Sequence, residues 1–392
     1  MPVQHNRWVR PVPSIARQAV QRRVLGLGLG FLLAAAPQFI HAQAPRVATA
    51  PGYGRFAEVV ASSRALIDSL MRARNLPGLS IAVSVDGEVV WSEGFGYANI
   101  EQGTVVTPTT KFRVGSISKP LTAAALALLY EQGLLDLDAP VQRYVPSFPA
   151  KAKGVITSRL LAGHLAGVRH YGSDAEFMSS KRYNTVLEGL EIFKDDTLLA
   201  APGTKYSYSS YGWNLLSAVV EGAAGEQFLA YMQEHVFRPL GLRHTVADYT
   251  DSIITGRSGF YDRTADSSLI NAPYVDNSYK WAGGGFLSTP EDLLRFANAH
   301  VQAGFLKPET VTLLWTSQQN AAGEQVSYGI GWEVGELNGR RLISHGGESV
   351  GGNSWLAILP DAKVALAVAA NIGGAGYGTV LSRILELFAA GR

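Results

Sequence analysis

The chain carries strand-like sequence at both ends and helix-like sequence between them. Residues 79–85 and 88–97 flank an Asp86-Gly87 turn, a pattern that predicts an antiparallel hairpin. Strand-like alternation returns near the C-terminus over 329–334, 341–344, 354–359 and 364–370. Because a strand buries its apolar face only as part of a sheet, we expect these distant runs to form one antiparallel sheet with helices packed on it, an α+β fold.

Helical patterns fill most of the remaining sequence. Apolar residues recur at helical spacing over 54–74, and an Ala/Leu-rich run over 117–132 ends at Gly133, a residue typical of helix C-termini. Further helical patterns lie between about 155 and 280, and a last one over 377–390. We therefore expect a sheet lobe over about 54–115 and 283–392, with a helical lobe over about 116–282 inserted into it.

Residues 1–44 differ from the rest and are expected to be a signal peptide that precedes one domain over 45–392. Five arginines and no acidic residue precede the apolar run 24–36, and Ala42-Gln43-Ala44 offers a small-x-small cleavage site. The apolar run is short for a membrane span, although an uncleaved anchor is an alternative. This pattern predicts a periplasmic or secreted protein without a stable membrane span after cleavage, and leaves open Sec or twin-arginine export and cleavage after Ala42 or Ala44.

Charge and cysteine content exclude several functions for the exported part. Without the five leader arginines, 29 basic residues remain against 32 acidic ones, a net charge of −3. No basic cluster is paired with stacking aromatic residues, so we expect no nucleic-acid partner. The chain has no cysteine, which excludes a thiol nucleophile and fits an exported protein that needs no disulfide.

Ser116 and Lys119 are a candidate nucleophile and base. They stand three residues apart where the Ala/Leu-rich helix begins, so both side chains leave the same face of its first turn. A serine hydroxyl is a weak nucleophile at neutral pH, and a nearby lysine can activate it if burial lowers the lysine pKa. This spacing alone is a weak signal, because it arises by chance in most proteins of this size.

Tyr208 is a candidate proton relay. It lies in the segment 202–210, which contains three serines and two tyrosines, just before the helical pattern that begins at Tyr211. Its phenol can pass a proton to or from a substrate if neighbouring cations shift its pKa. An aromatic turn that only packs on the next helix is the alternative.

The third candidate motif is His345-Gly346-Gly347-Glu348, at the end of a strand-like run. Two glycines let the backbone approach a substrate closely, and the peptide N–H beyond them can supply half of an oxyanion hole. The imidazole can orient a carboxylate or assist proton transfer, and a turn histidine is the alternative. His164 and His170 have no companions at metal-ligand spacing, so we expect structural roles for them.

Together the three motifs resemble the active-site signature of the penicillin-recognising serine hydrolases, the family of serine β-lactamases, DD-peptidases and esterases, and especially its class C β-lactamase-related branch. The resemblance implies a β-lactamase/transpeptidase-like fold. It also implies that Ser116 is acylated, that Lys119 is the base and that Tyr208 relays the proton. By the same resemblance the N–H groups of Ser116 and Glu348 form the oxyanion hole, and no metal or organic cofactor is needed.

The runs 134–146 and 273–289 are similar to the mitochondrial serine β-lactamase-like proteins of animals, and the likeness extends over roughly residues 55–390. Two positions depart from the wider family. Ser210 stands in place of the usual asparagine, and His345 in place of the lysine that binds the β-lactam carboxylate. The residues expected to bind substrate are Ser210, His345, Gly346, Gly347 and Glu348.

The sequence therefore predicts an exported serine hydrolase that cleaves an amide or ester bond in a small-molecule or peptide substrate. A peptidase or esterase is favoured because of Ser210 and His345. A β-lactamase or cell-wall DD-peptidase is one alternative. A self-assembling scaffold protein that keeps the hydrolase fold is another, and a homo-oligomer is left open.

Overall fold

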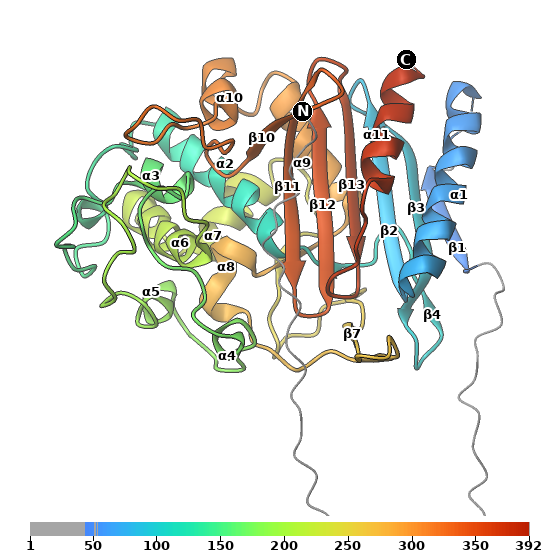
Figure 1. The fold of residues 1–392 in the computed structure, drawn as a ribbon, viewed down its shortest axis with the longest axis horizontal. Helices are drawn as coiled ribbons and strands as arrows, with labels where there is room; N and C mark the ends of the chain where they lie inside the picture. The colour runs from blue at the N-terminus through green and yellow to red at the C-terminus, as the bar shows by residue number, and fades with distance from the viewer. Residues whose placement is uncertain (1–43, 51, 53, 392) are drawn as a thin grey trace, which may run out of the picture.

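The structure is a computed structural model that describes residues 44–391 apart from 51 and 53, so the expected signal peptide lies, except for Ala44, outside the described residues. Its main element is an eight-stranded sheet in the order β1-β3-β2-β13-β12-β11-β10, with β4 added to β3 (Figure 1). The strands are β1 Arg46–Ala50, β2 Gly78–Val85, β3 Glu88–Asn99, β4 Thr104–Val105, β10 Glu333–Leu337, β11 Arg340–Ser349, β12 Gly352–Leu359 and β13 Val364–Ala370.

The two ends of the chain meet in the middle of this sheet. β2 pairs antiparallel with β3 across the Asp86-Gly87 turn, and its other edge pairs antiparallel with β13. The predicted single antiparallel sheet is therefore confirmed. The expected strand from residue 329 is wrong at its start, because β10 begins only at Glu333. Gly331, with φ at +79°, takes the left-handed conformation that an extended strand excludes.

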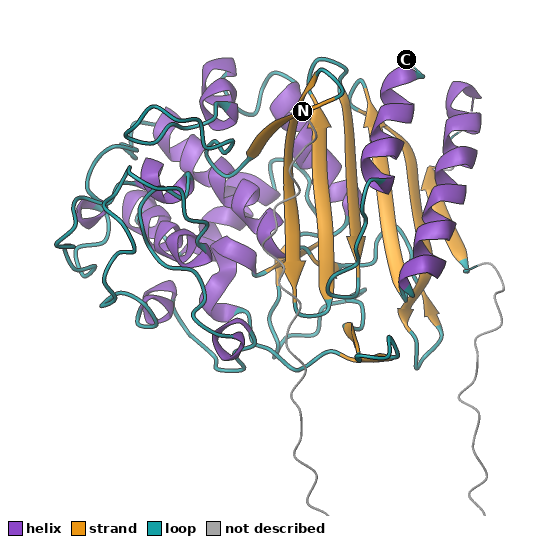
Figure 2. Ribbon diagram, in the orientation of Figure 1, coloured by secondary structure: helices purple, strands orange, loops and turns teal. Residues whose placement is uncertain are grey.

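Helices cover both faces of the sheet (Figures 1 and 2). On one face, α1 (Ala57–Arg74) lies beside α11 (Val380–Ala390), and Phe388 of α11 stacks on Trp91 of β3 at 6.1 Å between ring centroids. α9 (Pro290–Val301) packs on the opposite face against β2 and β13. Thr289 caps α9 by accepting a hydrogen bond from the Asp292 amide.

Most of the helices between β5 and β9 gather beside the sheet, where Figure 2 shows them as the purple group on the left. Two of them, α2 (Ser118–Glu131) and α6 (Ser210–Ala224), are buried along most of their length. The shorter ones are α3 Ser158–Ala162, α4 Asp174–Phe177, α5 Val186–Leu190, α7 Phe228–Tyr231 and α8 Trp281–Gly284, while α10 Pro308–Trp315 follows α9. Single-turn 3-10 helices are η1 Gly54–Phe56, η2 Gly115–Ile117, η3 Val141–Arg143 and η5 Ser278–Lys280, and η4 Met232–Phe237 is a π-helix. The boundaries of the two lobes stay predictions.

Two small antiparallel sheets were not predicted. The first joins β5 (Phe112–Arg113), β9 (Phe286–Ser288) and β6 (Val246–Ala247), and the second pairs β7 (Tyr261–Arg263) with β8 (Leu269–Asn271). β9 therefore does not belong to the main sheet. It pairs Phe112 with Ser288 and Arg113 with Leu287, and so joins the segment just before Ser116 to a distant part of the chain. No helix in the described part of the chain is both long and apolar enough to cross a membrane.

Candidate active site

Ser116 lies in a tight turn that is pressed against β11. The turn, η2, leads directly into α2, and Gly115 has φ at +49°. A Cβ at Gly115 would lie 2.4 Å from the carbonyl oxygen of Glu348 and 2.7 Å from its amide nitrogen. Only glycine fits this contact, which brings the half-buried Ser116 to the edge of β11.

Gly347 allows β11 to lie in close contact with Val114, in the segment before η2. A Cβ at Gly347 would lie 2.0 Å from the Val114 carbonyl oxygen and 2.3 Å from Ser354 Oγ. Ser354, opposite Gly347 in the β11–β12 register, donates a 2.8 Å hydrogen bond to that same carbonyl. The second glycine of the His-Gly-Gly motif therefore serves packing, while a Cβ at the first, Gly346, would meet open space.

The two glycines make a matched pair of variants. We expect Gly347→Ala to destabilise the protein by roughly 3 kcal/mol or more, because backbone atoms of Val114 must move. Gly346→Ala should change the free energy of unfolding by less than about 1 kcal/mol. Urea unfolding of both variants measures this difference, and equal losses would show that the contact at Val114 is not the constraint.

Lys119 is buried at the centre of the site and contacts Ser116. Its Nζ lies 2.9 Å from Ser116 Oγ, 3.1 Å from Ser210 Oγ and 2.7 Å from the carbonyl oxygen of Gly283. The side chain is fully buried, and burial lowers its pKa well below the usual value, with a smaller contribution from the charge of Lys280.

The surroundings of Nζ match a neutral amine. A neutral amine has two N–H groups and one lone pair, and the Gly283 carbonyl can only accept a hydrogen bond. The second N–H can be donated to Ser210 Oγ, which leaves the lone pair for the hydroxyl proton of Ser116. The geometry therefore places an amine that can accept a proton in contact with the Ser116 hydroxyl group.

Tyr208 lies between two imidazole rings, next to Ser116. Its hydroxyl shares a hydrogen bond with the Ser116 side chain, and Lys119 Nζ lies 4.9 Å from its ring centroid. The ring centroids of His164 and His170 lie 4.2 and 5.6 Å from that of Tyr208. Burial raises the pKa of Tyr208, against the direction expected from nearby cations, so the phenol keeps its proton at neutral pH.

The same two histidines cap the start of α6. The Ser209 amide donates to His164 Nδ1 at 3.0 Å, and the Ser210 amide donates to His170 Nδ1 at 3.1 Å. Both imidazoles therefore accept at Nδ1 and are neutral, and burial lowers the pKa of His170 to about 3. Ser210 is itself buried, with its hydroxyl directed at Lys119, so it helps to fix the Lys119 side chain rather than facing open solvent.

His345 is buried and uncharged. Its Nδ1 donates to the Gly346 carbonyl oxygen at 2.6 Å, so Nε2 accepts the hydroxyl proton of Tyr328 at 2.8 Å. Burial, with a smaller contribution from Lys119, lowers the pKa of His345 to about 3. The positive charge that would bind a carboxylate is therefore absent at neutral pH.

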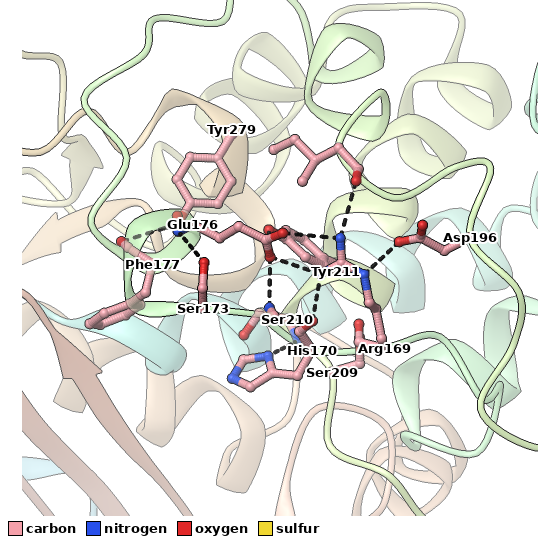
Figure 3. Close-up of polar contacts among 12 residues, drawn as sticks. Arg169, His170, Ser173, Glu176, Phe177, Asp196, Ser209, Ser210, Tyr211 and Tyr279 are labelled. Carbon is pink, nitrogen blue, oxygen red and sulfur yellow. Dashed lines mark hydrogen bonds and ion pairs between the residues drawn. The ribbon is translucent and has the colours of Figure 1, made fainter. Parts of the chain in front are cut away.

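The loop 169–177 forms one wall of the site, and Figure 3 shows the ion pairs and hydrogen bonds that hold it in place. Arg169 forms ion pairs with both Glu176 and Asp196. Ser209 Oγ donates to the Arg169 carbonyl oxygen at 2.6 Å, and the Tyr211 hydroxyl donates to Glu176 at 2.8 Å. These contacts fix the loop that carries His170 against the start of α6.

The structure brings Ser116, Lys119, Tyr208, Ser210, His345 and the backbone at Glu348 close together, while their roles stay predictions. Sequence reasoning missed Tyr328, Lys280 and Glu333 as neighbours of this group. Lys280 lies in the run 273–289, which the family resemblance singled out, but nothing in the pattern marked its side chain. Among the described residues no three His, Asp or Glu side chains gather closely enough to hold a metal ion.

Comparison with known proteins places the chain in a family. The Beta-lactamase family model matches residues 64–388. The chain belongs to the beta-lactamase family. The serine beta-lactamase-like protein LACTB, mitochondrial, of Homo sapiens is 35% identical over 410 residues, which cover 81% of this chain and 75% of that protein. A D-aminopeptidase of Gluconobacter oxydans is 27% identical over 304 residues, covering 75% of this chain and 56% of that protein.

Two solved structures share the fold of this chain. The octameric penicillin-binding protein homologue from Pyrococcus abyssi superposes with a TM-score of 0.70 at 26% identity, covering 81% of this chain and 74% of that one. The D-amino acid amidase from Ochrobactrum anthropi SV3 gives a TM-score of 0.74 at 22% identity, covering 85% and 99%. The predicted family and its β-lactamase/transpeptidase-like fold are confirmed.

Proposed function

We propose that this chain is an exported serine hydrolase that cleaves an amide or ester bond through an acyl-enzyme on Ser116. One observation carries the proposal: the amine of Lys119 is buried, has a lowered pKa and lies 2.9 Å from Ser116 Oγ. A base in contact with a hydroxyl is the arrangement that serine nucleophiles require. Membership of the beta-lactamase family, whose relatives include a D-aminopeptidase, supports it.

Acylation begins with proton transfer from Ser116 to Lys119. Ser116 Oγ then forms a bond to the substrate's carbonyl carbon, and the carbonyl oxygen takes the negative charge. The amides of Ser116 and Glu348 are our candidates to stabilise that oxyanion, because Gly115 holds its turn against the Glu348 backbone. The positive end of α2 adds to this stabilisation.

Tyr208 completes the proton path. Its phenol is protonated at neutral pH and shares a hydrogen bond with Ser116, so it can donate its proton to the leaving group and regain one from Lys119. The leaving amine or alcohol departs as the C–N or C–O bond breaks. Water then attacks the acyl-enzyme, gives up its proton along the same path, and Ser116 recovers its hydroxyl hydrogen.

The charges around the site favour a peptidase or esterase over a β-lactamase. His345 is neutral, and Ser210 is engaged with Lys119 and His170. Glu333 is half-buried, with its pKa raised by burial to about 7, and its charge acts on Tyr208 and Tyr328. A carboxylate on the substrate thus meets no cation at His345 and a partial negative charge near Tyr208.

A substrate comparison tests this preference. We expect p-nitrophenyl butyrate or an aminoacyl p-nitroanilide to be turned over with a kcat/KM about 100-fold above that of penicillin G, since one charge-assisted hydrogen bond to the carboxylate is missing. The measurement is absorbance-monitored hydrolysis by the same enzyme preparation. Equal or faster turnover of penicillin G would favour the β-lactamase, and stable acylation by it would favour the DD-peptidase.

Assembly and location are part of the same proposal. The likeness to a protein described as octameric gives one reason to expect a homo-oligomer. A scaffold protein would assemble whether or not Ser116 is intact, so light scattering of the wild type and Ser116→Ala, beside their activities, separates scaffold from enzyme. The proposal of a periplasmic or secreted location rests on residues 1–44. Its test is whether the protein is found outside the cytoplasm with the mass expected after loss of that leader.

A further inference from the structure

A second buried lysine, Lys280, lies beside the candidate site and has no part in the steps above. It ends η5 and directly precedes α8, whose Gly283 carbonyl accepts the hydrogen bond from Lys119 Nζ. Only 2% of Lys280 is exposed. A Cβ at Gly284 would lie 3.9 Å from Lys280 Cδ and 3.8 Å from the Gly115 carbonyl carbon. The lysine stem therefore runs close to the turn that carries Ser116.

Aromatic faces surround the Lys280 amine. Its Nζ lies 4.5 Å from the ring centroid of Phe177, 5.1 Å from that of Tyr279 and 5.7 Å from that of Tyr171. A long hydrogen bond of 3.4 Å reaches the Phe177 carbonyl oxygen. Ring faces attract a cation, so this cage can hold an ammonium group without a carboxylate at contact distance.

Hydrogen bonds hold the residues of the cage against the loop 169–177 and the start of α6. The Tyr279 hydroxyl donates to the carbonyl oxygens of Glu176 and Phe177 at 2.9 and 3.2 Å, and Figure 3 shows these contacts beside the Arg169 ion pairs. The Tyr171 hydroxyl is hydrogen-bonded to both Ser210 and Tyr279. Ser210 in turn contacts Lys119 at 3.1 Å, so one set of contacts fixes both amines.

We propose that Lys280 is a positioning residue that carries the positive charge of this lysine pair in its aromatic cage and thereby keeps Lys119 as the free amine that Ser116 needs. The inference rests on the proposed function of Lys119 as the base. Two like charges close together in a low dielectric repel, so a proton held on one amine disfavours a proton on the other. Three ring faces surround the Lys280 amine, whereas Lys119 Nζ lies near the Tyr208 ring alone, so the cage favours the proton on Lys280. The lone pair of Lys119 faces Ser116.

The other charged groups near Lys280 do not change which of the two lysines carries the proton. Arg113 on β5 lowers the pKa of Lys280 and Asp248, which follows β6, raises it, but these two form an ion pair with each other at 2.7 Å. His170 is neutral, and Glu176 is paired with Arg169. Burial is the largest effect and brings the pKa of Lys280 to about 7. Because the charge of Lys280 lowers the pKa of Lys119, the two lysines titrate as a coupled pair.

The test is the pH dependence of three variants. Lys119 works as a base only above its pKa, so activity falls on the acid side, and a higher Lys119 pKa moves that limb to higher pH. Lys280→Met and Lys280→Gln remove the charge and should move the acid limb of kcat/KM upward by about 1 pH unit. Lys280→Arg keeps a permanent charge and should leave the limb at or below its wild-type position.

The same limb is measured by the pH dependence of fluorophosphonate labelling, which depends on acylation alone. Far-ultraviolet circular dichroism shows which variants fold. If Lys280→Arg does not fold, the Lys280→Met and Lys280→Gln variants decide the question. A uniform loss of rate without a shift of the limb, or an equal shift in all three variants, would overturn the role of Lys280. Failure of the wild type itself to label would instead overturn the proposed function.

Discussion

Replacing Ser116 with alanine is expected to lower kcat for ester hydrolysis by about 10⁴-fold or more, because loss of the nucleophile leaves only binding and oxyanion stabilisation. The change should not disturb folding. Ser116 is half-buried, and Lys119 keeps its contacts with Ser210 and Gly283. The measurement is steady-state hydrolysis of p-nitrophenyl butyrate at neutral pH.

Ser118→Ala is the matched control for this variant. Ser118 lies two residues further on, and its hydroxyl accepts a 3.3 Å hydrogen bond from the Phe286 amide rather than contacting Lys119. Its loss should cost about 1 kcal/mol of stability and leave kcat within a few-fold. A Ser116→Ala enzyme that keeps a tenth of wild-type activity, or equal losses in both variants, would remove Ser116 from the reaction.

Replacing Lys119 with methionine should slow acylation by roughly 10³-fold, because the variant keeps an unbranched side chain one atom shorter but has no base. It also leaves the Gly283 carbonyl and the Ser210 hydroxyl without their partner, which should cost roughly 1–3 kcal/mol of stability. The measurement is the second-order rate constant of fluorophosphonate labelling, with unfolding followed separately.

Lys119→Arg separates a base from a fixed positive charge. Arginine stays protonated in proteins and cannot take the Ser116 proton, so this variant should label as slowly as Lys119→Met. A Lys119→Arg protein that is folded and labels at nearly the wild-type rate would show that the site needs a cation and not a free amine. That result would contradict the assignment of Lys119 as the base.

The sequence predicted those parts of the fold that have a local signature. The hairpin 79–97 and the helix after Ser116 follow from periodicity and turn residues over short windows. The small sheets β5–β9–β6 and β7–β8 did not follow, because strands of two or three residues carry no periodicity. Their existence depends on pairing between segments far apart in the chain.

The candidate site divides in the same way. Ser116 and Lys119 are neighbours on one turn, so their contact could be predicted from spacing alone. The protonation of His345 could not, because it depends on burial and on Tyr328, which sequence patterns do not connect with it. Nor could the role of Lys280, because two of its three cage residues, Tyr171 and Phe177, lie about a hundred positions away in the chain.

The most direct test of this account is peptide mapping by mass spectrometry after the protein reacts with a fluorophosphonate. The account predicts one adduct, on the peptide that contains Ser116, in the wild type, and none in Ser116→Ala. It also predicts that the adduct forms more slowly as the pH falls through the pKa of Lys119. An adduct on another residue, or an enzyme that hydrolyses esters while Ser116 stays unmodified, would contradict it.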